Sequence, residues 1–243
     1  MYEQFASYYD AFTTNVNYES RADYFDALIE RFGSGKGILL DLACGTGTLS
    51  FAMEARGYDV IAADISAEML DAAIEKKIES GSSIMFLHQD MTALDLFGTV
   101  SATICALDSI NHLDSIQKVE QAFEKVSLFT EPGGVFIFDV NTLYKHIHVL
   151  GDKAFILESD DCFLAWQNEL CADNSVKIFL DFFTPQGDLY SRESEFITEY
   201  YYSDDQLKSA VQKAGFTLCG IFDDLSMSAP GETSERKVFV CKK

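Results

Sequence analysis

Apolar positions in the first part of the chain recur with helical and strand periodicity in turn. Apolar side chains at 21–32 have helical spacing, and this pattern ends at a glycine-rich segment, 33–37. An apolar run at 38–42 then predicts a strand, and a glycine-bearing turn and a helix that ends at Gly57 follow it. The order is strand, tight turn, helix.

The same unit then repeats along the chain. A strand at 59–64 precedes a helix with Ser66 as its N-cap, and a third strand runs over 84–88. After a fourth strand from about 102 to 107, the pattern indicates a helix around 119–129, a turn at 132–134 and a fifth strand at 135–140. Strands that alternate with helices favour a parallel sheet with both faces covered.

Beyond Asn141 the periodicity changes. Apolar and polar residues alternate up to about Tyr202, and turn-forming residues interrupt them at 172–175 and 185–188, which is typical of antiparallel hairpins. Ser203 and Gln206 match a capping box that begins a further helix, and final strands are expected near 218–222 and 237–241. We therefore expect an α/β core at 1–141, an antiparallel β insertion at 142–202 and completion of the core at 203–243.

The charge narrows the range of partners. The chain has 39 acidic and 18 basic residues in 243, a net charge of -21. Such a field repels the phosphates of nucleic acids and anionic membranes, so we expect neither as a partner. The acidity can serve solubility alone, or it can attract a cationic substrate.

Cysteine usage and the N-terminus indicate a cytoplasmic protein. The six cysteines include no C-x-x-C pair, and no histidine cluster has metal-ligand spacing, so no metal is expected. Met1 to Phe5 lack the basic and apolar segments of a signal peptide, and no apolar run is long enough to span a bilayer.

The segment with the clearest chemistry is D-L-A-C-G-T-G at 41–47, where a strand passes into a helix. Its glycines let a ligand approach the backbone. Asp64, at the end of the second strand, can accept hydrogen bonds from ribose hydroxyls. A nucleoside cofactor is indicated. The third glycine of a dinucleotide-binding G-x-G-x-x-G is replaced by Ser50, which weighs against NAD.

The stretch D-x-A-C-G-T-G resembles the first motif of class I S-adenosylmethionine (SAM)-dependent methyltransferases. The opening Y-E-Q-F-A-S-Y-Y-D at 2–10 also looks like that of small-molecule members, including sugar-amine N-methyltransferases. The resemblance implies SAM as cofactor and a Rossmann-like, seven-stranded, mostly parallel sheet whose last strand is antiparallel. Helices cover both faces, and the hairpins form a lid beside the acceptor pocket.

The resemblance also assigns roles. Asp64 would bind the ribose, Asp90 the adenine amino group with Met91 against the ring, and residues 107–113 would line the methionine end and the acceptor. Tyr9 would lie near the methionine moiety. Independently of the resemblance, His112 is the histidine near the expected pocket and could deprotonate an amine or hydroxyl. The full set of expected SAM-binding residues is Tyr9, Asp41, Ala43, Cys44, Gly45, Gly47, Asp64, Ile65, Met69, Asp90, Met91, Leu107 and Asp108, with His112 and Tyr9 as catalytic candidates.

Structural roles compete with several of these assignments. The glycines could serve only a turn, and Asp90 could only cap a helix. His112 and Tyr9 could be packing residues. The tyrosine run at 200–202 favours sheet packing over an aromatic cage for a cation.

The expected function is methyl transfer from SAM to nitrogen or oxygen of a small molecule, with an amine favoured. Residues 108–111 read D-S-I-N rather than the N/D-P-P-Y type motif of DNA amino methyltransferases, and no cysteine follows a proline as in cytosine C5 enzymes. Three alternatives stay open: a non-catalytic SAM sensor or assembly module, a methyltransferase for RNA or protein, and a nicotinamide dehydrogenase. The oligomeric state is not indicated.

Overall fold

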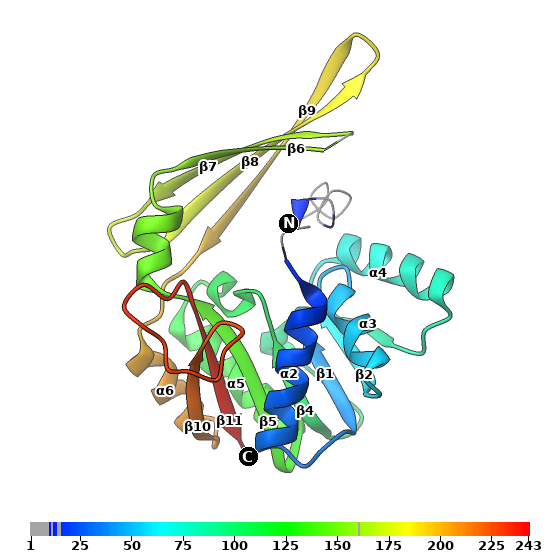
Figure 1. Cartoon of the computed structure of the whole chain (residues 1–243), viewed down its shortest axis with the longest axis vertical. Coiled ribbons are helices and arrows are strands. Elements are labelled where there is room, and N and C mark those ends of the chain that lie inside the picture. The colour runs from blue at the N-terminus through cyan, green and yellow to red at the C-terminus, as the bar shows by residue number, and fades with distance from the viewer. Residues whose placement is uncertain (1–9, 11, 14–15, 160) are drawn as a thin grey trace.

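The computed structural model describes residues 10, 12–13, 16–159 and 161–243, and these form two β-sheets with helices around one of them (Figure 1). The larger sheet has seven strands in the order β10-β11-β5-β4-β1-β2-β3. Its strands are β1 (Ile38–Leu42), β2 (Asp59–Asp64), β3 (Met85–His88), β4 (Val100–Cys105), β5 (Thr130–Asn141), β10 (Thr217–Asp223) and β11 (Arg236–Lys242).

Strand direction in this sheet confirms the expected class I arrangement. Neighbours from β5 through β4, β1 and β2 to β3 pair in parallel, whereas β11 is antiparallel to both β5 and β10. The strand order reverses between β1 and β4, and ligands of open α/β sheets bind outside the carboxyl ends of strands at such a reversal.

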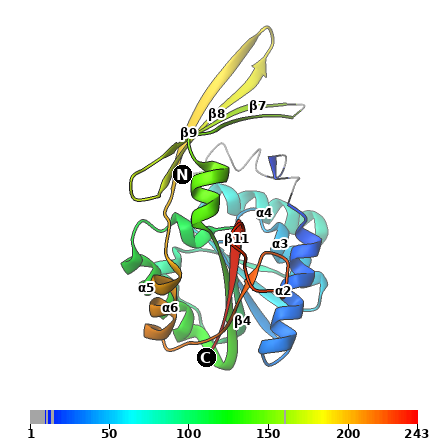
Figure 2. The ribbon, with the colours of Figure 1, turned by 60° about the vertical axis from the view of Figure 1, so that its left-hand side comes forward.

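Helices cover both faces of this sheet, as Figure 2 shows. Alternate side chains of a strand enter different cores: Leu39 belongs to the cluster beneath α2 and α3, and Leu40 to the cluster beneath α5 and α6. The long helices are α2 (Tyr18–Phe32), α3 (Thr48–Ala55), α4 (Ala67–Ser80), α5 (Ile116–Phe129) and α6 (Asp204–Lys213). Two short 3₁₀ helices, η1 (Met91–Ala93) and η2 (Ser109–His112), follow β3 and β4.

The second sheet, here called the hairpin sheet, is fully antiparallel in the order β6-β7-β8-β9. It contains β6 (Ala154–Glu158), β7 (Phe163–Leu170), β8 (Val176–Gln186) and β9 (Leu189–Glu199), and η3 (Lys145–Leu150) leads into it from β5. It therefore lies within the expected insertion, and Figure 1 shows it above the carboxyl edge of the large sheet. The exact division of the chain into three segments stays a prediction.

One face of the hairpin sheet is buried and carries its own apolar cluster. Phe12 packs against Phe182 on its buried face, with ring centroids 6.5 Å apart. Two residues earlier, the Asp10 carboxylate accepts a hydrogen bond of 2.7 Å from the Thr46 hydroxyl in the β1–α3 turn. Asp10 and Phe12 thus contact the large sheet and the buried face of the hairpin sheet, respectively.

Three expected boundaries were wrong. The turn at 132–134 lies inside β5, where a register shift between β4 and β5 and the positive φ of Gly133 accommodate the bend. Strand β8 continues through Pro185 and Gln186, so its turn with β9 comprises only 187–188. Strand β4 ends at Cys105 because Leu107 has φ +57° and cannot continue it.

No helix in the part of the chain that the structure describes is long and apolar enough to cross a membrane. Within the same residues, no three His, Cys, Asp or Glu side chains are grouped in a way that could hold a metal ion.

Candidate active site

The β1–α3 turn has left-handed backbone at three positions: Ala43 (φ 61°), Gly45 (φ 56°) and Gly47 (φ 77°). The two glycines differ in their surroundings. A Cβ atom on Gly45 would meet no other atom within 4 Å, whereas one on Gly47 would lie 3.1 Å from the Phe86 ring. Gly45 therefore leaves open space for a ligand beside the backbone, and Gly47 allows α3 to pack closely.

Asp64 ties this turn to the end of β2. Its carboxylate accepts hydrogen bonds from the Gly45 N–H at 2.7 Å and from the Ser66 N–H at 2.9 Å. Burial raises the pKa of Asp64, and those backbone donors and the nearby His112 oppose the rise. Because a carboxylate has about four acceptor sites, two backbone bonds leave capacity for ribose hydroxyls.

Asp41 is almost fully buried, at 2% exposure, and the Ser50 hydroxyl donates to its Oδ2 at 2.5 Å. Burial raises the pKa of Asp41 to about 7 against the opposing effect of this hydrogen bond. The contact also gives a reason for Ser50 at the place where dinucleotide-binding proteins have glycine: its hydroxyl holds the first turn of α3 to β1.

The ends of β2 and β3 contribute the next expected residues. Ile65 is 58% exposed at the sheet edge, whereas Met69 is buried in α4. Asp90 accepts hydrogen bonds of 2.8 Å from the N–H and hydroxyl of Thr92, so it caps η1. The capping alternative for Asp90 is therefore present, and its role towards adenine, with Met91 beside it, stays a prediction.

The end of β4 carries Leu107, Asp108 and η2, which ends at the half-buried His112. Buried Asn111 anchors this segment: its side chain donates to the Tyr200 carbonyl at 2.8 Å and accepts from the Asn141 N–H at 2.9 Å. Asn111 thus joins the end of β5 to the point where the chain returns from the hairpin sheet.

Glu199, the last residue of β9, lies close to η2. Glu199 is buried, its Oε2 accepts from the Asn141 side chain at 2.7 Å, and the His146 Nε2 lies 3.8 Å away. Burial raises the pKa of Glu199, Asp108 adds to the rise, and His112 and Lys145 oppose it. His112 also opposes the rise in the pKa of Asp64 and lowers the pKa of Asp108.

The structure brings most of the expected residues to one edge of the sheet. Asp41 lies in β1 and Asp64 is the last residue of β2. The others come after a strand: Ala43, Cys44, Gly45 and Gly47 after β1, Ile65 and Met69 after β2, Asp90 and Met91 after β3, and Leu107, Asp108 and His112 after β4. Tyr9 lies outside the described residues.

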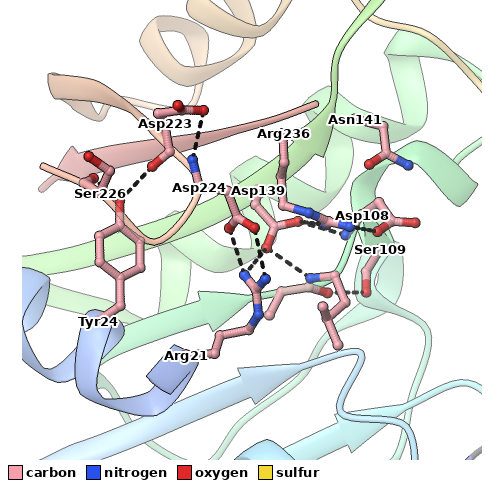
Figure 3. Close-up of polar contacts among 12 residues, drawn as sticks. Arg21, Tyr24, Asp108, Ser109, Asp139, Asn141, Asp223, Asp224, Ser226 and Arg236 are labelled. Carbon is pink, nitrogen blue, oxygen red and sulfur yellow. Dashed lines mark hydrogen bonds and ion pairs between the residues drawn. The ribbon is translucent and has the colours of Figure 1, made fainter. Parts of the chain in front are cut away.

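Sequence reasoning missed the ionic partners of this edge. Asp139 in β5 is fully buried and bonds Arg236 of β11, and Arg236 also bonds Asp108 (Figure 3). A lone aspartate within the apolar run 135–140 was the available signal, because a buried carboxylate requires a partner.

Known proteins resemble the chain over part or all of its length. A family model described as a methyltransferase domain matches residues 39–134. A putative methyltransferase of Geobacillus sp. (strain WCH70) is 32% identical over 100% of this chain and 99% of its own length. The crystal structure of an S-adenosylmethionine-dependent methyltransferase from Clostridium acetobutylicum ATCC 824 has a TM-score of 0.89 and 29% identity, covering 99% of this chain and 98% of its own.

A partial match concerns a sugar-modifying enzyme. The dTDP-3-amino-3,6-dideoxy-alpha-D-glucopyranose N,N-dimethyltransferase of Streptomyces fradiae is 30% identical over 51% of this chain and 47% of its own length. Together with the sheet order and the β1–α3 turn, the full-length similarity shows that the chain belongs to the class I SAM-dependent methyltransferases. It is an enzyme that uses SAM.

Proposed function

We propose that this enzyme transfers the methyl group of SAM to an amine nitrogen of a small molecule. The observation that carries the choice of an amine is the row of acids on the inner face of the hairpin sheet. Glu193, Glu195 and Glu199 alternate along β9 on the face that also holds buried Ile197. A protonated amine is the acceptor that such a face attracts.

The cofactor is proposed to lie across the carboxyl ends of β2, β1 and β4. Asp64 would bind its ribose, the open space at Gly45 would take its backbone-facing side, and its methionine end would extend towards the turn at 107–108. SAM supplies an activated methyl group, so the chain's own residues have to position the acceptor and exclude water.

His112 is proposed to receive a proton. A protonated amine cannot attack carbon, so it must lose a proton before the nitrogen–methyl bond forms and the carbon–sulfur bond breaks. An imidazole at the end of η2, with Asp64, Asp108 and Glu199 as the carboxylates that interact with it, is suited to accept that proton.

The tyrosine run at 200–202 is better explained by packing than by an aromatic cage for a cation. Tyr202 is buried, and Tyr201 packs against His146.

The first test is calorimetric titration with SAM, S-adenosylhomocysteine and NAD. Wild type is expected to bind the first two and not NAD. Asp64→Ala should weaken the binding of SAM and of S-adenosylhomocysteine by about tenfold or more, because the ribose hydroxyls lose their acceptor. Asp71→Ala, which removes an exposed acid from α4, is the matched control. Binding of NAD instead of SAM would reject the proposed cofactor site.

The second test measures transfer of a labelled methyl group from SAM to small primary amines and to their hydroxyl analogues. Transfer to amines, reduced by Glu195→Gln, would support the acidic face as the acceptor site. Transfer only to hydroxyl compounds would refute an amine acceptor, and SAM binding without transfer to any acceptor would favour a sensor or assembly module.

A further inference from the structure

The turn that follows β4 has an unusual backbone. Leu107 and Asp108 are consecutive non-glycine residues with φ of 57° and 56°. Each such residue costs about 1–3 kcal/mol, and it persists only where surrounding contacts fix it. Since the turn lies at the carboxyl end of β4, beside the proposed cofactor site, the contacts that fix it bear on the reaction.

Asp139 supplies two of these contacts. Its carboxylate accepts the Leu107 N–H at 2.9 Å and the Asp108 N–H at 2.6 Å, one on each oxygen. The Asp139 side chain is fully buried. Successive backbone N–H groups that converge on one carboxylate form an anion-binding concavity, and the bonds satisfy donors that burial would otherwise leave unpaired.

Arg236 completes the arrangement. Its guanidinium bonds the carboxylates of both Asp139 and Asp108, so it bridges β5 and the turn (Figure 3). Burial would raise the pKa of Asp108, but Arg236, Lys145 and His112 hold that pKa below its ordinary value. Asp108 therefore stays ionised and keeps its bond to Arg236.

A second arginine contacts the Asp139 carboxylate. Arg21 of α2 lies 3.6 Å from the Asp139 carboxylate and makes two hydrogen bonds, of 2.9 and 3.0 Å, to Asp224. Figure 3 shows the side chains of Asp139 and Asp224 near Arg21, and Arg236 reaching Asp139 from the neighbouring strand β11. The turn is thus held by side chains from β5 and β11, which are remote from it in sequence, and Arg21 of α2 contacts Asp139 in turn.

We propose that Asp139 and Arg236 are positioning residues for the methionine end of SAM, acting by holding the turn at 107–108 in its left-handed conformation. Asp64, at the end of β2, is the proposed ribose acceptor, so the opposite end of the cofactor would reach β4 and this turn. Neither side chain has to touch SAM. The inference rests on the proposed placement of the cofactor.

The test compares ligands that do and do not contain the amino-acid end of SAM. S-Adenosylhomocysteine has it, whereas 5′-methylthioadenosine keeps only the adenosine and thioether. Calorimetry would measure both, the weaker ligand by displacement, on wild type, Asp139→Asn and Arg236→Lys. Lys237→Met is the matched control, because it removes an ion pair with Asp204 from the next position of the same strand.

We expect Asp139→Asn to weaken the binding of S-adenosylhomocysteine by about tenfold or more, and the binding of 5′-methylthioadenosine by less than about threefold. The reason is that an amide offers one acceptor oxygen, whereas the two N–H groups of the turn need two. Arg236→Lys keeps the charge but loses the planar fork, and a smaller effect of the same selectivity is expected. Lys237→Met should leave both affinities unchanged.

Equal weakening of the two ligands, or unchanged affinity in a folded variant with a lower melting temperature, would show a merely structural role and overturn the inference. If Asp139→Asn does not fold, Arg236→Lys decides by the same criterion. Failure of wild type to bind SAM would instead reject the proposed cofactor site, so the two failures are distinguishable.

Discussion

Gly45 and Gly47 have the same left-handed backbone but different surroundings. A methyl group at Gly45 would project into open space, whereas at Gly47 it would press on Phe86 and Ala73 at 3.1 and 3.3 Å. With SAM placed as proposed, the first glycine would serve ligand approach, whereas the second allows α3 to pack against β3 and α4.

Substitution of the two glycines should separate these roles. Gly45→Ala is expected to lower the free energy of unfolding by only about 1 kcal/mol, from backbone strain, yet weaken SAM binding by about tenfold or more. Gly47→Ala should lower the free energy of unfolding by about 2 kcal/mol or more, because the added methyl group makes a close contact with the Phe86 ring. Urea unfolding and calorimetry measure the two effects; equal stability losses would contradict this account.

Asp41 should make stability depend on pH. Its pKa is raised from 3.8 to about 7 in the folded state by burial, so the folded protein holds a proton that the unfolded chain releases near pH 4. The contribution of this proton to the free energy of unfolding is fully present below pH 4. It is lost as pH rises to about 7, at about 1.4 kcal/mol for each pH unit between the two pKa values.

The variant Asp41→Asn removes that titration and keeps an oxygen for Ser50. Its free energy of unfolding, relative to wild type, should therefore rise between pH 4 and pH 7 and stay level above it. Urea unfolding of both proteins across this range is the measurement. A constant difference would mean that Asp41 does not titrate with a raised pKa.

Among the elements, α6 is the one whose start is most fully specified by local sequence. Ser203 and Gln206 form the expected capping box, with the Ser203 N–H bonded to the Gln206 side chain at 2.9 Å. Ser203→Ala should lower the free energy of unfolding by about 1 kcal/mol. Ser203→Asp, which retains a capping acceptor, should recover most of it, and equal losses in the two variants would contradict a capping role.

The hairpin sheet shows how far an element can be predicted. Alternation and turn residues indicate antiparallel strands, and the structure confirms them. The contact of Phe12 with Phe182, and the bond of Asn111 where the chain returns, attach this sheet to the rest of the molecule. Neither contact follows from local pattern.

At the scale of the molecule, the net charge of -21 opposes compactness through self-repulsion. Raising NaCl from about 0.01 to 0.1 M shortens the screening length from about 30 to 10 Å. The free energy of unfolding in urea is expected to increase by about 1 kcal/mol over this range. KCl should give the same increase, because screening does not depend on the monovalent cation; a decrease would show that attractive surface pairs dominate.

The sequence by itself determined the strand–turn–helix order, the glycine turn and Asp64, because these depend on residues close together in the chain. It did not determine the bridge from Asp139 to Arg236, since these residues are 97 positions apart and meet only when β11 inserts beside β5. The left-handed turn at 107–108 depends on that bridge, and its first residue, Leu107, was expected to be the last residue of the fourth strand. Tertiary structure decided it because the backbone strain there is offset only by partners that long-range folding brings together.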